Sequence, residues 1–135
     1  MDIIISINDK INQEETVALY KANKWSAAEQ PSLLLKAINN SHSYVTARVN
    51  NKLIGLGNSI SDGYLVVYFP HLLVDPEFHG KGIGRMIMNK FQEHYAGFHM
   101  QILTSDANSV PFYNKLGFEK AGNTEPKWIY KGNEH

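Results

Sequence analysis

Hydrophobic and polar positions follow two different spacings along the chain, and each spacing predicts one kind of element. Short runs rich in β-branched and aromatic residues predict strands, which we place at 3–7, 44–49, 53–60, 64–74, 101–103, 118–121 and 127–131. Apolar positions three and four apart predict helices, which we place near 13–21, 31–38, 83–95 and 109–116. The clearest of these helices has one apolar face, formed by Ile83, Ile87, Met88, Phe91 and Tyr95.

Capping and turn residues mark where these elements begin and end. The N-x-x-E pattern at 12–15 and the S-x-x-E pattern at 26–29 are capping boxes that predict the starts of the first two helices. Asn-Asn at 50–51 and Asp-Gly at 62–63 predict tight turns between antiparallel strands. Pro70 interrupts the longest apolar run. Because proline donates no hydrogen bond to a strand ladder, it predicts an edge or a bulge there.

The order of the elements, β-α-α-β-β-β-α-β-α-β-β, predicts an α/β (α+β) fold. Antiparallel strands come first, a βαβ crossover lies in the second half, and the last two strands form a closing hairpin. The chain has no repeat, linker or low-complexity tract. We therefore expect one domain over residues 1–135.

Composition excludes several classes of function. Thirteen Lys and Arg balance thirteen Asp and Glu, so no overall field favours nucleic acid or an anionic membrane. The chain has no cysteine, and its six histidines lack the spacing of metal ligands. No apolar run approaches the ~20 residues of a membrane helix, and the start lacks the basic region of a signal peptide. We expect a cytoplasmic protein that binds no metal, nucleic acid or membrane.

A glycine-rich turn is the strongest chemical signal in the sequence. Gly-Lys-Gly-Ile-Gly at 80–84 follows a strand and opens a helix. The first N–H groups of a helix have no partner within it, and the helix dipole favours an anion there. Lys81 and Arg85 add positive charge. The G-x-G-x-G spacing matches neither a P-loop nor a dinucleotide fingerprint, so the turn by itself is either an anion site of another kind or a simple connection between strand and helix.

The residues around this turn, LLVDPEFHGKGIG at 72–84, closely resemble the signature of the GNAT superfamily of N-acetyltransferases. In that family a strand ending in V-D-P precedes [Q/R]-x-x-G-x-[G/A] at the start of a long helix. The resemblance implies acetyl-CoA as cofactor, with its pantetheine arm along the strand and its pyrophosphate on the turn. The residues implied for the arm are Leu72, Leu73 and Val74, and those for the pyrophosphate are His79, Gly80, Lys81, Gly82, Ile83, Gly84 and Arg85. His79 stands where Gln or Arg is usual.

A second segment, NSVPFYNKLGF at 108–118, resembles the family's A-x-x-F-Y-x-K-x-G-F motif, with a serine in place of the alanine. The resemblance implies that Tyr113 is the general acid that protonates the leaving thiolate. It also implies that Asn108 hydrogen-bonds the pantetheine arm and that Phe112 and Lys115 flank the cofactor. The fold that it implies is a mixed, mostly antiparallel sheet of six to seven strands flanked by four helices. The fourth and fifth strands splay around the cofactor.

Acetyl transfer to an amine also needs a proton acceptor and a polarised carbonyl. His71, on the strand before the cofactor segment, is the candidate base because imidazole titrates near neutrality. Strand alternation places His71 and Leu73 on one face and Leu72 and Val74 on the other. A backbone N–H near Val74 is the candidate that polarises the carbonyl, if a bulge frees it. No cysteine or elbow serine supports a covalent route, so direct attack by the amine is expected.

The acceptor is the least determined part of the prediction. Acidic and aromatic side chains suit a cationic or aryl amine, and the candidates for the wall of its site are Trp25, Glu29, Asp62, Tyr64 and Tyr68. A small-molecule amine is the first hypothesis. Acetylation of a protein lysine or N-terminus and a non-catalytic acyl-CoA-binding module are the alternatives, and an intact Tyr113 argues against the last. Dimers are common in the family that the chain resembles, so the resemblance also suggests a homodimer.

Overall fold

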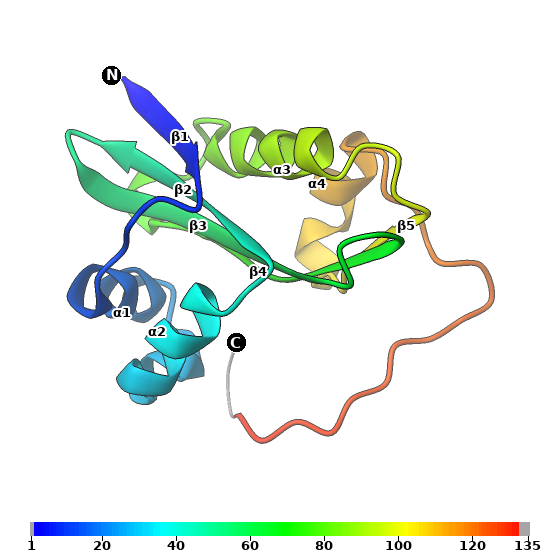
Figure 1. Cartoon of the computed structure of the whole chain (residues 1–135), viewed down its shortest axis with the longest axis horizontal. Coiled ribbons are helices and arrows are strands. Elements are labelled where there is room, and N and C mark those ends of the chain that lie inside the picture. Colours follow the sequence, from blue (N-terminus) through cyan, green and yellow to red (C-terminus); the bar gives the residue numbers. More distant parts are fainter. Residues whose placement is uncertain (1, 133–135) are drawn as a thin grey trace.

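The computed structural model describes residues 2–132, which form one five-stranded sheet with helices on both faces (Figure 1). The strands are β1 (Ile3–Ile7), β2 (Ser43–Val49), β3 (Lys52–Ser61), β4 (Val66–Val74) and β5 (Met100–Ile102). The helices are α1 (Gln13–Ala22), α2 (Pro31–Asn39), α3 (Ile83–His94) and α4 (Val110–Lys115), with short 3-10 helices η1 (Ser26–Glu29), η2 (Pro76–Phe78) and η3 (Ala107–Ser109). The strand order is β1-β2-β3-β4-β5. The first three pairs are antiparallel, whereas β4 and β5 are parallel across the α3 crossover.

Two hydrophobic clusters, one on each face of the sheet, hold these layers together. The first joins the sheet to α3, and its buried members include Val45, Val67, Phe69, Ile87 and Phe91. The second joins the opposite face to α1 and α2, and its buried members include Leu19, Tyr20, Leu34, Ile38 and Leu56. All five residues of the predicted apolar helix face are buried, which confirms that prediction.

A glycine in β3 lets α3 lie close to the sheet. A Cβ atom built on Gly57 would lie 2.8 Å from Cε2 of Phe91 and 3.1 Å from Cγ2 of Ile87. A separation below 3 Å is a steric clash, so any larger residue would push the helix off the strand. The middle of α3 therefore packs directly on β3.

Local signals placed most of the elements correctly. Asn12 and Glu15 form a capping box, in which the Asn12 side chain accepts a hydrogen bond from the Glu15 N–H and the Glu15 side chain accepts one from the Asn12 N–H. Asn50 and Asn51 both have positive φ, as a tight type I′ turn requires. These features depend on a few neighbouring residues, so sequence reasoning can find them.

Two predictions of elements were wrong. The S-x-x-E pattern at 26–29 does not cap α2, because these residues form the separate helix η1 and α2 begins at Pro31 after Gln30. The closing hairpin at 118–121 and 127–131 is also absent, since no residue from 118 to 132 is in a strand. The sheet therefore has five strands within the described residues instead of six or seven. Both predictions used local patterns alone. Whether two segments pair as strands, or two helical segments join, depends on contacts with distant parts of the chain.

Pro70 lies in a β-bulge, as its inability to donate a hydrogen bond predicts. Asn58 pairs with His71 and Ile60 pairs with Tyr68, so two residues of β4 oppose one residue of β3. The extra residue reverses which side chains face α3. Before the bulge Phe69 packs against α3, whereas after it Leu72 packs on that side.

Candidate functional site

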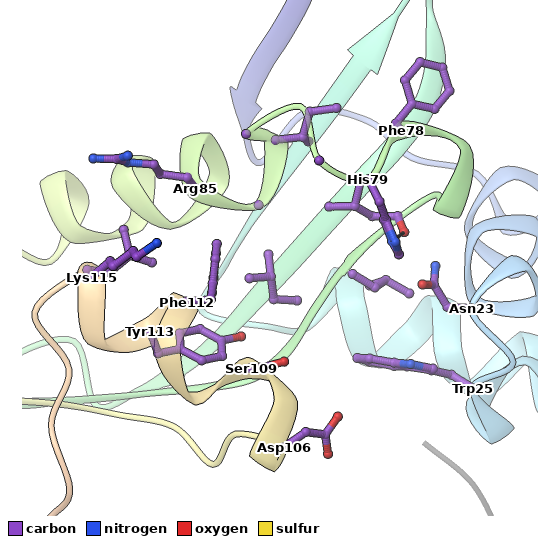
Figure 2. Close-up of a pocket in the computed structure, with 18 residues that line it drawn as sticks. Asn23, Trp25, Phe78, His79, Arg85, Asp106, Ser109, Phe112, Tyr113 and Lys115 are labelled. Atoms are coloured by element: carbon purple, nitrogen blue, oxygen red, sulfur yellow. Dashed lines mark hydrogen bonds between the residues drawn. The ribbon is translucent and has the colours of Figure 1, made fainter.

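A cavity of about 660 Å³ opens where β4 separates from β5. The two strands pair only as far as Tyr68 and Ile102, so the remainder of β4 has an unpaired edge. The N-terminus of α3 and one side of α4 form the other walls (Figure 2). The residues that line the cavity are Asn23, Trp25, Leu72, Leu73, Val74, Phe78, His79, Gly80, Gly82, Ile83, Gly84, Arg85, Asp106, Ser109, Phe112, Tyr113, Lys115 and Leu116.

The bulge decides which backbone groups of β4 face this cavity. The Asp75 N–H donates to the Ile54 carbonyl at 2.7 Å, which directs Asp75 toward β3. The His71 N–H is directed to the same side and donates to Oδ1 of Asn58 at 3.1 Å. In an antiparallel ladder alternate residues point to opposite sides. The N–H groups of Leu72 and Val74 therefore point to the cavity side.

The side chains of β4 divide between the two faces as alternation predicts. Leu72 and Val74 pack toward α3, whereas Leu73 is buried against α1 and α2. His71 lies on the same face as Leu73, in contact with α1. β4 thus has an open edge on the cavity side, and its face toward α1 carries the titratable side chain of His71.

The N-terminus of α3 has no side-chain cap. Gly82 is the N-cap residue with a φ of 78°, and among residues 2–132 no side chain caps this helix end. The first intrahelical hydrogen bond runs from the Met86 N–H to the Gly82 carbonyl at 3.0 Å. The N–H groups of Ile83, Gly84 and Arg85 have no acceptor within the helix, and such groups favour an anion.

Two cationic side chains lie at the same end of the cavity. Arg85 from α3 and Lys115 from α4 line it together, and Figure 2 shows them at the end opposite Trp25 and Asn23. Within residues 2–132 neither cation forms an ion pair with a carboxylate. The positive end of a helix and two cations therefore act together at this end, as a phosphate group requires.

His79 has a different contact from the one that the sequence suggested. Its Nε2 lies 2.8 Å from the Val74 carbonyl oxygen, so Nε2 carries a hydrogen and donates it. This bond ties the glycine turn to the end of β4. The bond therefore holds the turn in place. The second ring nitrogen of His79, Nδ1, takes no part in this hydrogen bond.

Tyr113 is a titratable side chain in the wall of the cavity. Figure 2 shows its hydroxyl directed into the cavity beside Ser109. Its ring packs edge-on against Phe112 and Phe118, with centroid separations of 4.9 and 5.9 Å. Burial, and to a smaller extent the negative charge of Asp106, raises the pKa of Tyr113 to about 12. The phenol therefore stays protonated at neutral pH and can donate a hydrogen bond.

His71 belongs to an aromatic cluster at the other end. The hydroxyl of Tyr20 lies 2.7 Å from Nδ1 of His71, and the Trp25 ring lies edge-on to His71 at 5.2 Å. His71 itself is not among the cavity-lining residues, but Trp25 is. Burial raises the pKa of Tyr20, so this phenol remains neutral. Sequence reasoning missed Tyr20 because a tyrosine on an amphipathic helix has the same pattern as an ordinary core residue.

Seven of the predicted site residues do not line the cavity, namely Glu29, Asp62, Tyr64, Tyr68, His71, Lys81 and Asn108. For Asp62, the structure shows which other contacts its side chain makes. Oδ1 of Asp62 accepts hydrogen bonds from the N–H groups of Tyr64 and Leu65, each at 2.8 Å, and from that of Val66 at 3.2 Å. These bonds lower the pKa of Asp62 and fix the β3–β4 turn. Asp62 is therefore a turn residue rather than part of the acceptor wall.

Five lining residues were not predicted, namely Asn23, Phe78, Asp106, Ser109 and Leu116. Ser109 and Leu116 lie inside the second motif, so their position could have been inferred from it. Asn23 follows α1 and comes to the cavity through the packing of α1 on β4, which no local pattern reports. No group of three His, Cys, Asp or Glu side chains in the described chain is arranged to hold a metal ion.

The cavity thus combines an uncapped helix end, two cationic side chains and a protonated tyrosine along one open strand edge. The model of the acetyltransferase (GNAT) domain matches residues 8–129. The match covers most of the chain, and the chain belongs to the GNAT family of acetyltransferases.

Similar proteins agree with this assignment. An uncharacterized N-acetyltransferase, ycf52, from Gracilaria tenuistipitata var. liui is 30% identical over 127 residues, which are 87% of this chain and 68% of that protein. The ycf52 protein of Pyropia yezoensis is 25% identical over 126 residues, covering 88% of this chain and 71% of that protein. A solved GNAT family acetyltransferase from Streptococcus pneumoniae TIGR4 is 25% identical with a TM-score of 0.82, covering 96% of this chain and 99% of that one. No helix in residues 2–132 is long and apolar enough to cross a membrane.

Proposed function

We propose that this protein transfers the acetyl group of acetyl-CoA to a primary amine of a small molecule, by direct attack within a ternary complex. One observation carries the proposal. The uncapped N-terminus of α3, the open edge of β4 and the protonated hydroxyl of Tyr113 all face one cavity. Each has a separate task in acetyl transfer, and the fold brings the three together.

The residues present fit acetyl-CoA. The N–H groups at the start of α3 suit a pyrophosphate, with Arg85 and Lys115 beside them. The outward N–H groups of Leu72 and Val74 suit an extended amide-bearing arm, since such an arm can pair with a strand edge. When bound, acetyl-CoA supplies the activated acetyl group as a thioester.

The chain's own groups then orient the reacting atoms and handle charge. The Val74 N–H is placed to donate to a carbonyl oxygen, which stabilises negative charge that develops there. Tyr113 holds its proton at neutral pH and can donate it, or a hydrogen bond, to a leaving sulfur. Holding both substrates in line contributes most of the rate in such a reaction.

We propose His71 as the base that accepts the proton of the amine, directly or through water. In the tautomer that carries its hydrogen on Nδ1, this nitrogen donates to the Tyr20 oxygen, and the proton of the amine would be accepted at Nε2. Tyr20 would then be a positioning residue, because its neutral hydroxyl orients the imidazole without taking part in proton transfer.

The acceptor amine is proposed to enter at the end of the cavity formed by Asn23 and Trp25 (Figure 2). The face of an indole attracts a cationic or aryl amine, and the Asn23 amide offers both a donor and an acceptor. Protein lysines and N-termini are the alternative acceptors, so peptides belong in the same experiment.

The direct test measures thiol release from acetyl-CoA with a panel of small amines and of peptides. We expect release with small amines, and release with peptides alone would replace the small-molecule acceptor with a protein. No release with any acceptor, despite measurable binding of acetyl-CoA, would favour a non-catalytic binding module.

Binding of acetyl-CoA is tested by substituting the glycine turn. Gly82→Glu places a carboxylate against the α3 N-terminus, so we expect at least a 100-fold loss of acetyl-CoA affinity by calorimetry. Gly97→Glu is the matched control, because Gly97 also has positive φ and open space around its Cβ position but lies beyond the other end of α3. Equal affinity in the two variants would refute the pyrophosphate site.

A further inference from the structure

A buried polar side chain on β3 lies beside the bulge of β4. Asn58 is only 5% exposed, and it stands opposite His71 at the point where the pairing of β3 and β4 shifts. In a hydrogen-bonded pair of a regular antiparallel ladder, the N–H of one residue donates to the main-chain carbonyl of the other. Here the side-chain oxygen Oδ1 of Asn58 accepts the His71 N–H at 3.1 Å. A side chain therefore takes part in the ladder at the bulge.

The other end of the Asn58 amide is held by the end of α2. Its Nδ2 donates to Oγ of Ser41 at 3.0 Å, and the Ser41 hydroxyl donates to the Ala37 carbonyl at 2.9 Å. A hydroxyl has a single hydrogen, so Ser41 can only accept from Asn58. This requirement fixes which way the amide is turned, with Nδ2 toward Ser41 and Oδ1 toward His71.

The contact with His71 sets the direction of the groups that follow it on β4. N–H groups alternate along a strand, so a His71 N–H held toward β3 places those of Leu72 and Val74 on the cavity side. Pro70, which precedes His71, has no N–H with which to fix the register. The first main-chain donor after Pro70 is thus held by the side chain of Asn58.

The same contact fixes the main chain that carries the imidazole of His71. Nδ1 of His71 lies 2.7 Å from the Tyr20 hydroxyl, on the face of the sheet that α1 and α2 cover. Asn58 contacts the end of α2 through Ser41. The main chain and the side chain of His71 are therefore held by two different residues, Asn58 and Tyr20.

We propose that Asn58 is a positioning residue of the acetyltransferase site. Anchored by Ser41, it fixes the bulge of β4 so that the N–H groups of Leu72 and Val74 face the pantetheine arm of acetyl-CoA. Asn58 does not line the cavity, so it acts through β4 and not by contact with a ligand. The inference rests on the proposed function, because that function assigns the open edge of β4 to the arm.

The first test compares the binding of two ligands to the whole chain by calorimetry. Coenzyme A has the pantetheine arm, whereas 3′-phospho-ADP has the same phosphates without it. Asn58→Leu keeps much of the side-chain volume but leaves the buried His71 N–H without its acceptor. We expect the affinity for coenzyme A to fall about 10-fold, with little change for 3′-phospho-ADP. An equal loss for both ligands, or no loss for coenzyme A, would overturn the proposal.

Asn58→Asp tests whether the acceptor oxygen is responsible. One carboxylate oxygen can accept the His71 N–H, and the Ser41 hydroxyl can turn to donate to the other. We expect urea unfolding to show a less stable chain, because a charge is buried, while the wild-type ratio of the two affinities is kept. A selective loss equal to that of Asn58→Leu would overturn the proposal.

Ser59→Ala is the matched control for lost stability. Ser59 is the next residue of β3 and is fully buried, but its hydroxyl contacts the Ser43 carbonyl and the Tyr95 hydroxyl. We expect this variant to be less stable, with both affinities unchanged. A selective loss of coenzyme A affinity in Ser59→Ala would show that destabilising β3 is sufficient, and would overturn the proposal.

Ser41→Ala repeats the test without changing Asn58, at a position that is only half-buried. It removes the anchor of Nδ2, so we expect a selective loss of coenzyme A affinity of about three-fold, which Ser41→Thr restores. Unchanged affinity in Ser41→Ala would overturn the proposal. These ratios measure binding alone. An active chain with equal ratios would overturn the role of Asn58 only, whereas an inactive chain with the expected ratios would contradict only the proposed activity.

Discussion

At the scale of single residues, the site depends on two phenols whose surroundings keep them protonated. Tyr113 has a pKa raised to about 12 by burial and by Asp106, and burial also raises the pKa of Tyr20. One phenol faces the cavity and the other contacts His71. They therefore have different expected effects on the reaction, and each can be tested by removing one oxygen atom.

Tyr113→Phe removes the proposed proton donor while keeping the ring that packs on Phe112 and Phe118. We expect kcat to fall about 100-fold, in the range typical of a general acid, with little change in the acetyl-CoA dissociation constant. Because the pKa is raised to about 12, ionisation of Tyr113 is not expected to lower the wild-type rate below about pH 11. Steady-state rates across pH with parallel calorimetry check this, and an unchanged kcat would remove Tyr113 from the donor role.

Tyr20→Phe tests the proposed positioning of His71 without disturbing the contact with Trp25. The protonated imidazole loses an acceptor for Nδ1–H, so the acidic limb of the kcat/KM profile is expected to move to lower pH by up to about one unit. His71→Gln is expected to abolish that limb. The exposed His99, outside the cavity, provides the control His99→Gln, and an identical profile in all three variants would exclude His71 as the base.

At the scale of elements, an ion-pair network joins α1 to the sheet. Arg48 on β2 donates to Oε1 of Glu15 at 2.8 Å, and its Nε lies 3.3 Å from Oδ2 of Asp9. The hydrogen bond from Arg48 is the main cause that lowers the pKa of Glu15 from its ordinary value of 4.5. A depressed pKa means that the folded state favours the carboxylate, so this contribution is present above the ordinary pKa and is lost as pH falls below it.

Glu15→Gln keeps an oxygen for the capping box but removes the charge that Arg48 contacts. We expect it to lower the free energy of unfolding by about 1 kcal/mol at neutral pH, a modest value because water still reaches both side chains. The difference from wild type is expected to shrink as pH falls below about 4. Glu14→Gln, in the same helical turn but exposed, is the control for urea unfolding at several pH values. A difference that does not vary with pH would show that the charge is not responsible.

At the scale of the whole molecule, the two hydrophobic clusters have separate consequences for the site. The cluster under α3 holds this helix against the sheet, with close approaches at Gly55 and Gly57, and so supports the proposed anion-binding end. The cluster under α1 and α2 brings Asn23, Trp25 and Tyr20 to the opposite end. The proposed cofactor half and the proposed acceptor half of the site thus rest on different cores. Substitutions in α1 or α2 can therefore change the acceptor without altering the cofactor site.

The sequence alone determined the features that depend on a few adjacent residues. The capping box at 12–15, the turn at 50–51 and the uncapped glycine turn before α3 all follow from local backbone preferences. The second family motif also implies that Tyr113 lies near the cofactor, and Tyr113 lines the cavity. Pro70 predicted a bulge for the same local reason.

Only the tertiary structure decided the features that depend on residues far apart in the chain. The contact between Tyr20 and His71 joins positions 51 residues apart, and no spacing along α1 distinguishes it from core packing. The charge of Asp62 favours a place in the acceptor wall, whereas only the fold shows that Asp62 hydrogen-bonds to the β3–β4 turn. The segment 127–131 has strand-forming residues, but a strand exists only where another edge is available to pair with it, and pairing depends on the arrangement of the whole fold.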